Sequence, residues 1–583
     1  MKTAALGLLA ASLLGLHAAA RPAPESESES VPYLEPRANP SVTIASGTVI
    51  GAAMPETDNW GGIPFAQPPT GPLRLKPPVK AEAIGTFDAT GAAGACPQMA
   101  MSTAGKSLLL DVLGDLVDLP FFQTAVGESE DCLTVSVARP KGTTADAKLP
   151  VLFWIFGGGF EMGWSSMYDG TSLVQNAAAL GKPYVFVAVN YRLGGFGFMP
   201  GKEVLADGAA NLGLLDQRMG LEWVADNIAA FGGDPDRVTL WGESAGAISV
   251  FDQMALYGGN NMYRGRPLFR AAILDSGSIV PADPVDCPKG QAVYDTVVAA
   301  AGCGGASDTL ACLRAADYTT FLDAANAVPA ILSYQSLALA YLPRPDGTAL
   351  PASPEELLTG GRYAAVPLIL GDQEDEGTFF ALFQSNLSTP ADVADYLGDV
   401  FFAGATPAQL AALVATYDAS RSPAAGSPFR TGVLNQVYPA FKLLAAMLGD
   451  LVFTLTRRAT LEAHARLHGD AAPTWSYLAS YGYGIPVLGT FHASDVLQVF
   501  YGILPDYASR ATQSYYANFV YNLDPNDASG GTGAASKVAM DWPRWGAGRQ
   551  LMNFMVESAG LVVDDFRNAS YQFIVENTAA LHV

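Results

Sequence analysis

The sequence predicts an α/β protein with a central, mostly parallel β-sheet. Short apolar runs rich in β-branched and aromatic residues alternate with stretches of helical periodicity, such as residues 221–230. Such runs are typical of strands buried on both faces, and their alternation with helices indicates this fold class. A turn motif at residues 242–246 joins one run to the next helix and marks a sheet edge where function is expected. The predicted strands cover residues 149–156, 184–189, 238–241, 271–274, 366–370 and 475–478.

The chain is long enough for a large hydrophobic core. Its 583 residues are 50% hydrophobic and 15% charged. We find no internal repeat, and two long stretches, 281–358 and 389–470, have helical patterns without a domain boundary. We therefore expect a single domain over residues 41–583, in which these two stretches are helical insertions.

The first 40 residues predict secretion. Residues 1–20 have the pattern of a signal peptide, with Lys2 at the start, an apolar stretch at 4–16 and small residues at the cleavage site. The apolar stretch is shorter than the roughly 20 residues of a membrane-spanning helix, and no later segment is long and uncharged enough to span a bilayer. Residues 21–40 alternate Glu with Ser and contain several prolines, which predicts a disordered linker or pro-segment. We therefore expect a secreted, extracellular protein without a transmembrane segment.

Charge and glycosylation motifs agree with that location. The net charge is −23, and no Lys/Arg-rich run is present, which argues against nucleic acid as a partner. Two Asn-x-Ser sequons, at Asn386 and Asn568, are candidate glycosylation sites in a secreted protein.

Residues 242–246 (Gly-Glu-Ser-Ala-Gly) form a candidate nucleophile elbow around Ser244. They follow the apolar run 238–241 and precede a helical stretch at 247–250. A strand, this tight turn and a helix together lift the serine hydroxyl out of the sheet, where a base and a substrate reach it. The flanking glycines permit a turn in which larger side chains would clash. Ser244 is therefore the predicted nucleophile.

A serine nucleophile needs a base, and elimination among the five histidines indicates His492. His17 leaves with the signal peptide, and His582 is the next-to-last residue. His464 and His468 are four residues apart, as in some metal sites, but no third ligand is evident, which favours a solvated helix face. His492 lies in a Gly-Thr-Phe-His loop after the last predicted strand. We expect no metal site.

The acid of the triad is expected between serine and histidine in the chain. Residues 372–376 follow the predicted strand 366–370 and contain four carboxylates, namely Asp372, Glu374, Asp375 and Glu376. Spacing alone does not choose among them. The carboxylates outside the triad are expected to form a solvated acidic loop or cap, since a calcium-binding loop pattern is lacking.

Backbone N–H groups that stabilise an oxyanion are predicted at two places. The glycine triplet 157–159 follows the predicted strand 149–156 and allows a close approach of substrate to the backbone. Ala245 follows the nucleophile and presents its N–H at a helix N-terminus.

The ordered set of motifs resembles the type-B carboxylesterases, the cholinesterase-like branch of the α/β-hydrolases. Within that branch the sequence is most similar to fungal lipases and sterol esterases of the Candida rugosa type. The resemblance extends from about residue 42 to near the C-terminus. The matching segments are 62–69, 130–133, 154–160, 190–192, 231–235, 242–246, 371–377 and 489–492.

The resemblance implies residue roles that spacing leaves open. It implies an α/β-hydrolase fold with Glu376 as the acid, and Ser276 as a residue that supports this acid. It assigns the oxyanion donors to Gly158, Gly159 and Ala245.

The resemblance also implies a disulfide framework and a lid. It pairs Cys96 with Cys132 and Cys303 with Cys312, which leaves Cys287 as the odd thiol. The lid is expected within residues 96–132. There, residues 108–119 are apolar except for three aspartates on one helical face, which also fits an ordinary amphipathic core helix. An opened lid would expose an apolar patch that favours a homodimer.

These features predict a secreted serine hydrolase of carboxylic esters that uses Ser244, His492 and Glu376 and needs no cofactor. The expected substrates are lipid esters, meaning triacylglycerols and steryl esters, at a lipid–water interface. One alternative is a general carboxylesterase for short soluble esters, against which the apolar lid argues. A more remote alternative is a non-catalytic binding or adhesion protein on the same fold, although all three triad positions are filled.

Overall fold

The computed structural model describes residues 37–99, 127–417, 435–482, 484–500, 506–526 and 540–583. Within it, residues Asn39–Val583 form one compact unit. The predicted signal peptide (1–20), most of the predicted linker (21–40) and the predicted lid segment (108–119) lie outside the described residues, and so does the dimer surface expected there.

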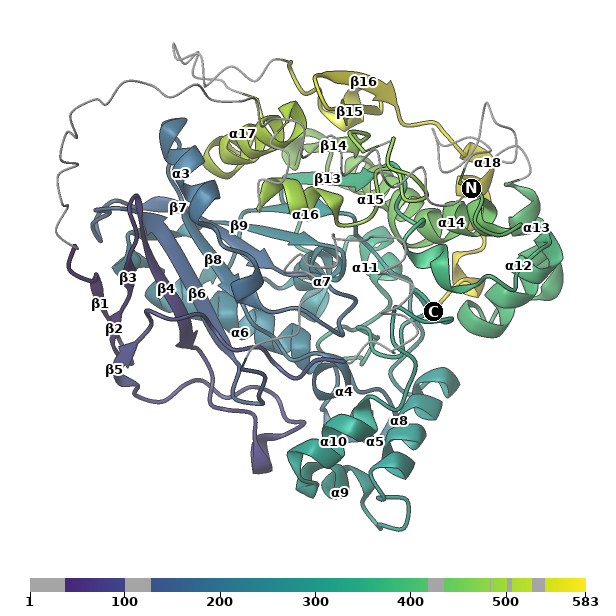
Figure 1. Cartoon of the computed structure of the whole chain (residues 1–583), viewed down its shortest axis with the longest axis horizontal. Helices are drawn as coiled ribbons and strands as arrows, with labels where there is room; N and C mark the ends of the chain where they lie inside the picture. The colour runs from purple at the N-terminus through teal and green to yellow at the C-terminus, as the bar shows by residue number, and fades with distance from the viewer. Residues whose placement is uncertain (1–36, 100–126, 418–434, 483, 501–505, 527–539) are drawn as a thin grey trace, which may run out of the picture. The chain divides into compact units, whose positions relative to one another are not determined.

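The described residues contain an eleven-stranded mixed sheet, in the order β16-β15-β14-β13-β12-β9-β7-β8-β6-β4-β3 (Figure 1). Every neighbouring pair from β8 through β7 to β15 is parallel, and the pairs outside this block are antiparallel. The strands are β3 (Ala52–Ala53), β4 (Thr57–Pro64), β6 (Thr134–Pro140), β7 (Leu149–Ile155), β8 (Val185–Val189), β9 (Gly233–Glu243), β12 (Ala271–Asp275), β13 (Leu368–Gln373), β14 (Thr474–Ala479), β15 (Gln550–Phe554) and β16 (Ala559–Val563).

The predicted fold class is confirmed. The six predicted strands correspond to β7, β8, β9, β12, β13 and β14. Their residues are almost all buried, as expected for strands covered on both faces. Strands toward the two ends of the sheet, such as β4 next to the edge and β16 at the edge, have mixed burial and no continuous apolar run, so the sequence pattern did not reveal them.

Helices cover both faces of the sheet (Figure 1). One layer contacts β4, β6 and β7, and it contains α3 (Thr171–Ala179), α17 (Tyr507–Asn522) and, packed on α17, α16 (Ser494–Val499). The other layer contacts β7, β9, β12 and β13, and it contains α6 (Leu212–Asn227), α7 (Ala245–Gly259), α11 (Pro354–Thr359) and α15 (Leu455–His468). None of the helices in the described ranges combines the length and the apolar character that a membrane span requires.

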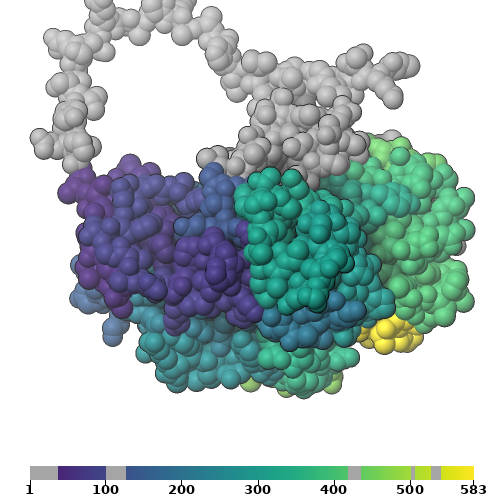
Figure 2. Space-filling model, turned by 90° about the horizontal axis from the view of Figure 1, so that it is seen from below, coloured from purple at the N-terminus to yellow at the C-terminus, as the bar shows by residue number. Residues whose placement is uncertain are grey.

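Both stretches predicted as insertions contain several helices, but in the first stretch residues 327–353 have no regular secondary structure. The first contains α8 (Pro288–Ala300), α9 (Thr309–Ala315), α10 (Tyr318–Ala325) and α11; the second contains α12 (Pro390–Tyr396), α13 (Pro407–Ala415), α14 (Phe441–Gly449) and α15. Figure 2 shows the teal segment around α8–α10 beside the purple N-terminal region. Arg74 joins them, because its guanidinium contacts the Glu130 carboxylate at 2.6 Å and also donates to the Ala316 carbonyl.

Two disulfides form between the cysteines that the resemblance paired. Cys96 is bonded to Cys132, and Cys303 to Cys312. Cys287 is a buried free thiol that caps α8, where its Sγ accepts a hydrogen bond from the Gly290 N–H at 3.3 Å. Its role is therefore local and structural.

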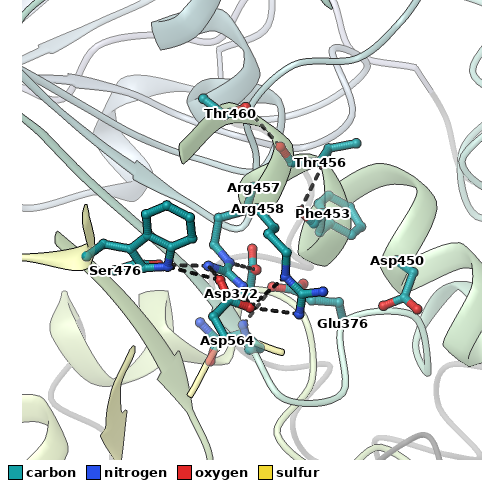
Figure 3. Close-up of polar contacts among 12 residues, drawn as sticks. Asp372, Glu376, Asp450, Phe453, Thr456, Arg457, Arg458, Thr460, Ser476 and Asp564 are labelled. Carbon is teal, nitrogen blue, oxygen red and sulfur yellow. Dashed lines mark hydrogen bonds and ion pairs between the residues drawn. The ribbon is translucent and has the colours of Figure 1, made fainter. Parts of the chain in front are cut away.

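A buried charge network ties β13 to β14 and to the segment after β16 (Figure 3). The Arg457 guanidinium, on α15, donates to the carboxylate of Asp372 at 2.6 Å, to the hydroxyl of Ser476 at 2.9 Å and to the carboxylate of Asp564 at 2.8 Å. Arg458 donates to Asp564 at 2.9 Å. All five side chains are buried, so each charge depends on its partners for the solvation that it has lost.

Removing the central arginine should therefore be costly. We expect Arg457→Ala to lower the free energy of unfolding by about 3–5 kcal/mol, because it leaves the buried Asp372 carboxylate without its arginine partner. The matched control is Arg544→Ala, since Arg544 pairs with Asp470 while 47% of its own side chain is exposed. That control should cost less than about 1 kcal/mol in the same urea titration. Equal losses for the two variants would contradict a special role for the network.

Candidate active site

Ser244 occupies a strained turn between β9 and α7. Its backbone has φ +56° and ψ −125°, a conformation that non-glycine residues rarely adopt. The turn is closed on both sides by glycines. A Cβ on Gly242 would lie 2.4 Å from the Gly246 backbone, and one on Gly246 would lie 2.0 Å from the Ile155 carbonyl oxygen. The structure therefore explains both glycines of the motif by lack of space.

Three of the predicted residues, Ser244, His492 and Glu376, come together beyond the carboxyl ends of the strands. The Nε2 atom of His492 lies 2.8 Å from the Ser244 Oγ, and its Nδ1 lies 2.6 Å from an Oε of Glu376. The second Glu376 oxygen accepts the Gln373 N–H at 2.7 Å. All three side chains are mostly buried, and the rings of Phe380 and others pack on the imidazole.

The four carboxylates of residues 372–376, at the end of β13 and in the loop after it, have different partners. Asp372 is held by the buried arginine network (Figure 3). Asp375 holds the histidine loop, since its carboxylate accepts the Thr490 N–H and its own N–H donates to the Thr490 carbonyl, each at 2.9 Å. Glu374 bonds to β14 through its backbone, and Glu376 faces the imidazole. The expectation of a solvated acidic loop is wrong, because all four side chains are buried.

The predicted oxyanion residues surround the serine. Gly158 and Gly159 have φ of +113° and +65°, and both line a cavity together with Ser244. Ala245 is the first residue of α7, so its N–H is among the helix N–H groups without an intrahelical acceptor. The left-handed backbone conformation at Gly159 favours glycine there.

Ser276 lies beside the site without contacting the acid. Its N–H donates to the Gly371 carbonyl at 2.8 Å and links β12 to β13. Its hydroxyl is buried and has no hydrogen-bond partner in the described part of the chain, so no bond joins it to Glu376. The support it gives to the acid strand is thus through the backbone.

Glu243 is a further acidic residue at the site that the motif analysis passed over. One of its carboxyl oxygens lies 3.3 Å from the His492 Nε2. Burial, with the nearby carboxylates of Asp495 and Glu376, raises the pKa of the Glu243 carboxyl well above its usual range. Burial therefore favours the neutral form of this carboxyl. Its signal in the sequence was a carboxylate that follows the apolar run 238–241 directly before the serine.

Two cavities meet at Ser244 and share Gly159 and Ile331. The space that no atom fills, parts open to solvent included, is about 570 Å³ on the histidine side and about 580 Å³ on the helix side. The histidine-side cavity is also lined by Met162, Leu332, Phe379, Phe380, Phe491 and His492. The helix-side cavity is also lined by Phe160, Ala245, Ile248, Asp252, Leu337 and Leu339, among others. Both linings are mainly apolar.

The solvated face expected for His464 is wrong, because its side chain is buried. Its Nε2 lies 2.9 Å from the Ala472 carbonyl and therefore donates, so its Nδ1 accepts the Tyr363 hydroxyl at 2.9 Å. His468 packs against the same tyrosine ring. Within the described ranges, no three His, Cys, Asp or Glu residues gather as metal ligands would.

The two sequons are accessible. Asn386 and Asn568 are both exposed, Asn568 at the first position of α18 (Asn568–Glu576). Glycosylation at either residue stays a prediction.

The fold is that of the α/β-hydrolases, a class of hydrolytic enzymes. Among solved structures, Aspergillus niger EstA superimposes with a TM-score of 0.77 at 27% identity, covering 94% of this chain and 99% of that chain. The model of the carboxylesterase family matches residues 38–574. The chain belongs to the carboxylesterase family and is a carboxylic ester hydrolase.

Curated relatives in this family are similar over nearly their full lengths. The chain is 57% identical to a secreted triacylglycerol lipase of Gibberella zeae, over 95% of this chain and 93% of that protein. It is 42% identical to Lipase 4 of Diutina rugosa, over 94% and 97%. It is 31% identical to the para-nitrobenzyl esterase of Bacillus subtilis, over 86% and 92%. The predicted resemblance to fungal lipases is confirmed.

The buried His464 predicts a pH dependence of stability. Burial lowers its pKa from 6.5 to about 4. Between these values the unfolded chain binds a proton that the folded chain does not, so stability present above pH 6.5 is lost as the pH falls toward 4. We expect the wild type to lose about 3 kcal/mol more than His464→Gln between pH 7 and pH 4 in urea unfolding. Parallel losses in the two proteins would contradict this cause.

Proposed function

We propose that this protein is a secreted lipid esterase in which Ser244, His492 and Glu376 form the catalytic triad. The observation that carries the proposal is the continuous hydrogen-bonded series from the Ser244 hydroxyl through the imidazole to the Glu376 carboxylate, at the junction of two apolar cavities. A serine so placed has a base to remove its proton and apolar space for a lipid ester.

Acylation begins when Ser244 attacks the ester carbonyl carbon. The His492 Nε2 takes the hydroxyl proton, and the Glu376 carboxylate stabilises the resulting imidazolium through Nδ1–H. The carbonyl oxygen becomes an oxyanion that accepts hydrogen bonds from the N–H groups of Gly158, Gly159 and Ala245. Because these donors belong to a rigid glycine turn and a helix terminus, they need little reorganisation during the reaction.

Collapse of the intermediate expels the alcohol and leaves an acyl-serine. The same imidazolium donates its proton to the departing alkoxide oxygen. Water then enters, gives its proton to His492 and attacks the acyl carbonyl, which releases the carboxylic acid and restores the Ser244 hydroxyl.

The position of this proton transfer indicates which part of the ester each cavity receives. The departing oxygen must lie near the His492 Nε2, so the histidine-side cavity receives the alcohol part of the ester. The helix-side cavity, which lies along Ala245 and Ile248, then receives the acyl chain. Their apolar linings favour long-chain esters over small polar ones, because burial of each methylene contributes about 0.8 kcal/mol.

The relatives support the lipid assignment and the secreted location. Two similar fungal proteins, 57% and 56% identical to this chain, are named as a secreted triacylglycerol lipase and a secreted lipase. The two disulfides also suit an oxidising compartment. Triacylglycerols and steryl esters are both proposed substrates. The runner-up is a carboxylesterase of short soluble esters, which the relationship to para-nitrobenzyl esterase favours.

The identity of the acid is tested by two matched substitutions. Glu376→Gln should lower kcat on the order of a thousandfold, because a neutral amide does not stabilise the imidazolium. Asp372→Asn should lower the melting temperature while kcat stays within about tenfold, because Asp372 contacts Arg457 and not His492. Comparable losses of kcat in the two variants, measured on one ester, would reject Glu376 as the acid.

Substrate class is tested with three esters: emulsified triolein, emulsified cholesteryl oleate and soluble para-nitrophenyl butyrate. We expect turnover of at least one emulsified lipid ester, with no detectable turnover of any ester by Ser244→Ala. Circular dichroism of the variant controls for folding. Activity retained by Ser244→Ala would reject the mechanism, whereas wild-type turnover of the butyrate alone would favour the runner-up.

A further inference from the structure

A single acidic side chain, Asp252, lies in the helix-side cavity. It is on α7, eight residues after Ser244, and it is the only Asp, Glu, Lys or Arg in that helix. Its side chain is 0% exposed, and it lines the same cavity as Ser244. Neither of its carboxyl oxygens has a hydrogen-bond partner in the described part of the chain.

The neighbouring residue shows that such isolation is not general on this helix. Gln253 is equally buried, but its amide donates to the Leu214 carbonyl at 2.8 Å and to the Gln217 side chain at 3.1 Å. Gln253 thus contacts the protein interior, whereas Asp252 faces the cavity. A buried polar group without a partner destabilises the folded state, which makes Asp252 a poor choice for packing alone.

The chemistry of Asp252 fits an uncharged polar partner. Burial raises the pKa of its carboxyl well above the ordinary range, which favours the protonated form. A protonated carboxyl has one O–H donor and two acceptor oxygens. A hydroxyl group both donates and accepts, and is therefore a matched partner. The remaining named members of the lining, such as Ile248 and Leu337, are apolar and surround a hydrocarbon chain.

The position of Asp252 indicates how far along the chain such a hydroxyl would lie. Eight residues of α-helix rise about 12 Å. With carbon–carbon bonds of about 1.5 Å, an extended acyl chain covers this distance in roughly ten carbons. An acyl group attached to Ser244 that runs along α7 would thus bring its carbons near the tenth to the Asp252 carboxyl.

We propose that Asp252 is a specificity-determining residue that binds a hydroxyl group near the tenth carbon of the acyl chain, so that the enzyme prefers esters of hydroxylated fatty acids. This inference rests on the proposed function, because it takes the helix-side cavity as the acyl site. A hydroxylated chain leaves no buried polar group unpaired, whereas an unsubstituted chain leaves Asp252 without a partner.

The test compares para-nitrophenyl 10-hydroxydecanoate with para-nitrophenyl decanoate. The measured quantity is the ratio of their kcat/KM values in the wild type, Asp252→Leu, Asp252→Asn and Ile248→Val. Leucine has the same branching and number of heavy side-chain atoms as aspartate but no polar atom, and asparagine keeps a donor and an acceptor. Ile248 lies one helical turn before Asp252 on the same cavity wall, so Ile248→Val controls for a change of volume alone.

We expect the ratio to fall on the order of tenfold in Asp252→Leu, mainly through KM, and to stay within about threefold of wild type in Asp252→Asn and Ile248→Val. The preference should also be weaker for 6-hydroxyhexanoate over hexanoate, because that chain ends before Asp252. A ratio that is the same in the wild type and Asp252→Leu would overturn the inference. If Asp252→Leu does not fold, a wild-type ratio of one or less would overturn it equally.

Failure of this inference is distinguishable from failure of the proposed function. A fluorophosphonate that labels the wild type but not Ser244→Ala reports the nucleophile independently of acyl preference. Labelling with turnover of both esters but an unchanged ratio rejects the role of Asp252 alone. Absence of both labelling and turnover rejects the proposed function.

Discussion

The active site depends on the parallel register of three neighbouring strands. Asp275, the last residue of β12, pairs with Glu243 of β9 on one side and with Gly371 of β13 on the other. The parallel pairing continues one residue past β9, since the Ser244 N–H donates to the Asp275 carbonyl at 2.9 Å. Ser244 and the loop that carries Glu376, the proposed nucleophile and acid, are therefore placed by backbone bonds, and a slip of one residue would turn each side chain to the wrong face.

The histidine is positioned differently, because it does not follow a strand directly. Its loop is attached to the acid loop through the two bonds between Asp375 and Thr490. One acidic residue of the loop after β13 thus holds the base in place while another contacts it. A third, Asp372, secures the same strand to α15 through Arg457. Because each of these three carboxylates has its own buried partner, the acidic segment can lie inside the protein.

Burial also sets the electrostatics around the imidazole. Desolvation raises the pKa of Glu243 well above its usual range and that of Asp275 to about 6, although Asp275 accepts hydrogen bonds from Trp241 and Tyr516. Several carboxyl groups therefore lie close together without the full repulsion that ionised groups would produce. Burial also raises the pKa of Asp252, which lines a cavity and does not belong to a hydrogen-bonded cluster.

Much of the fold was predictable, because doubly covered parallel strands require continuous apolar runs, and those runs are visible at β7 and β9. Strands toward the ends of the sheet, such as β4 and β16, were not, since their mixed burial leaves no continuous apolar run. At the site, the elbow glycines and the histidine loop pointed to Ser244 and His492. Choosing among four neighbouring carboxylates needed either the family resemblance or the structure, because their partners come from distant segments. The unpaired state of Asp252 is a property of the folded cavity.

The Cys96–Cys132 bond has a consequence for how the chain breaks. It joins two residues 36 positions apart, and both half-cystines are buried in the compact unit. A protease that cuts once between them creates new termini but releases no fragment, because the bond still links the two pieces. On a denaturing electrophoresis gel, cut and uncut molecules would migrate together as long as the disulfide is intact. Only reduction of the bond would separate the two pieces and reveal the cut.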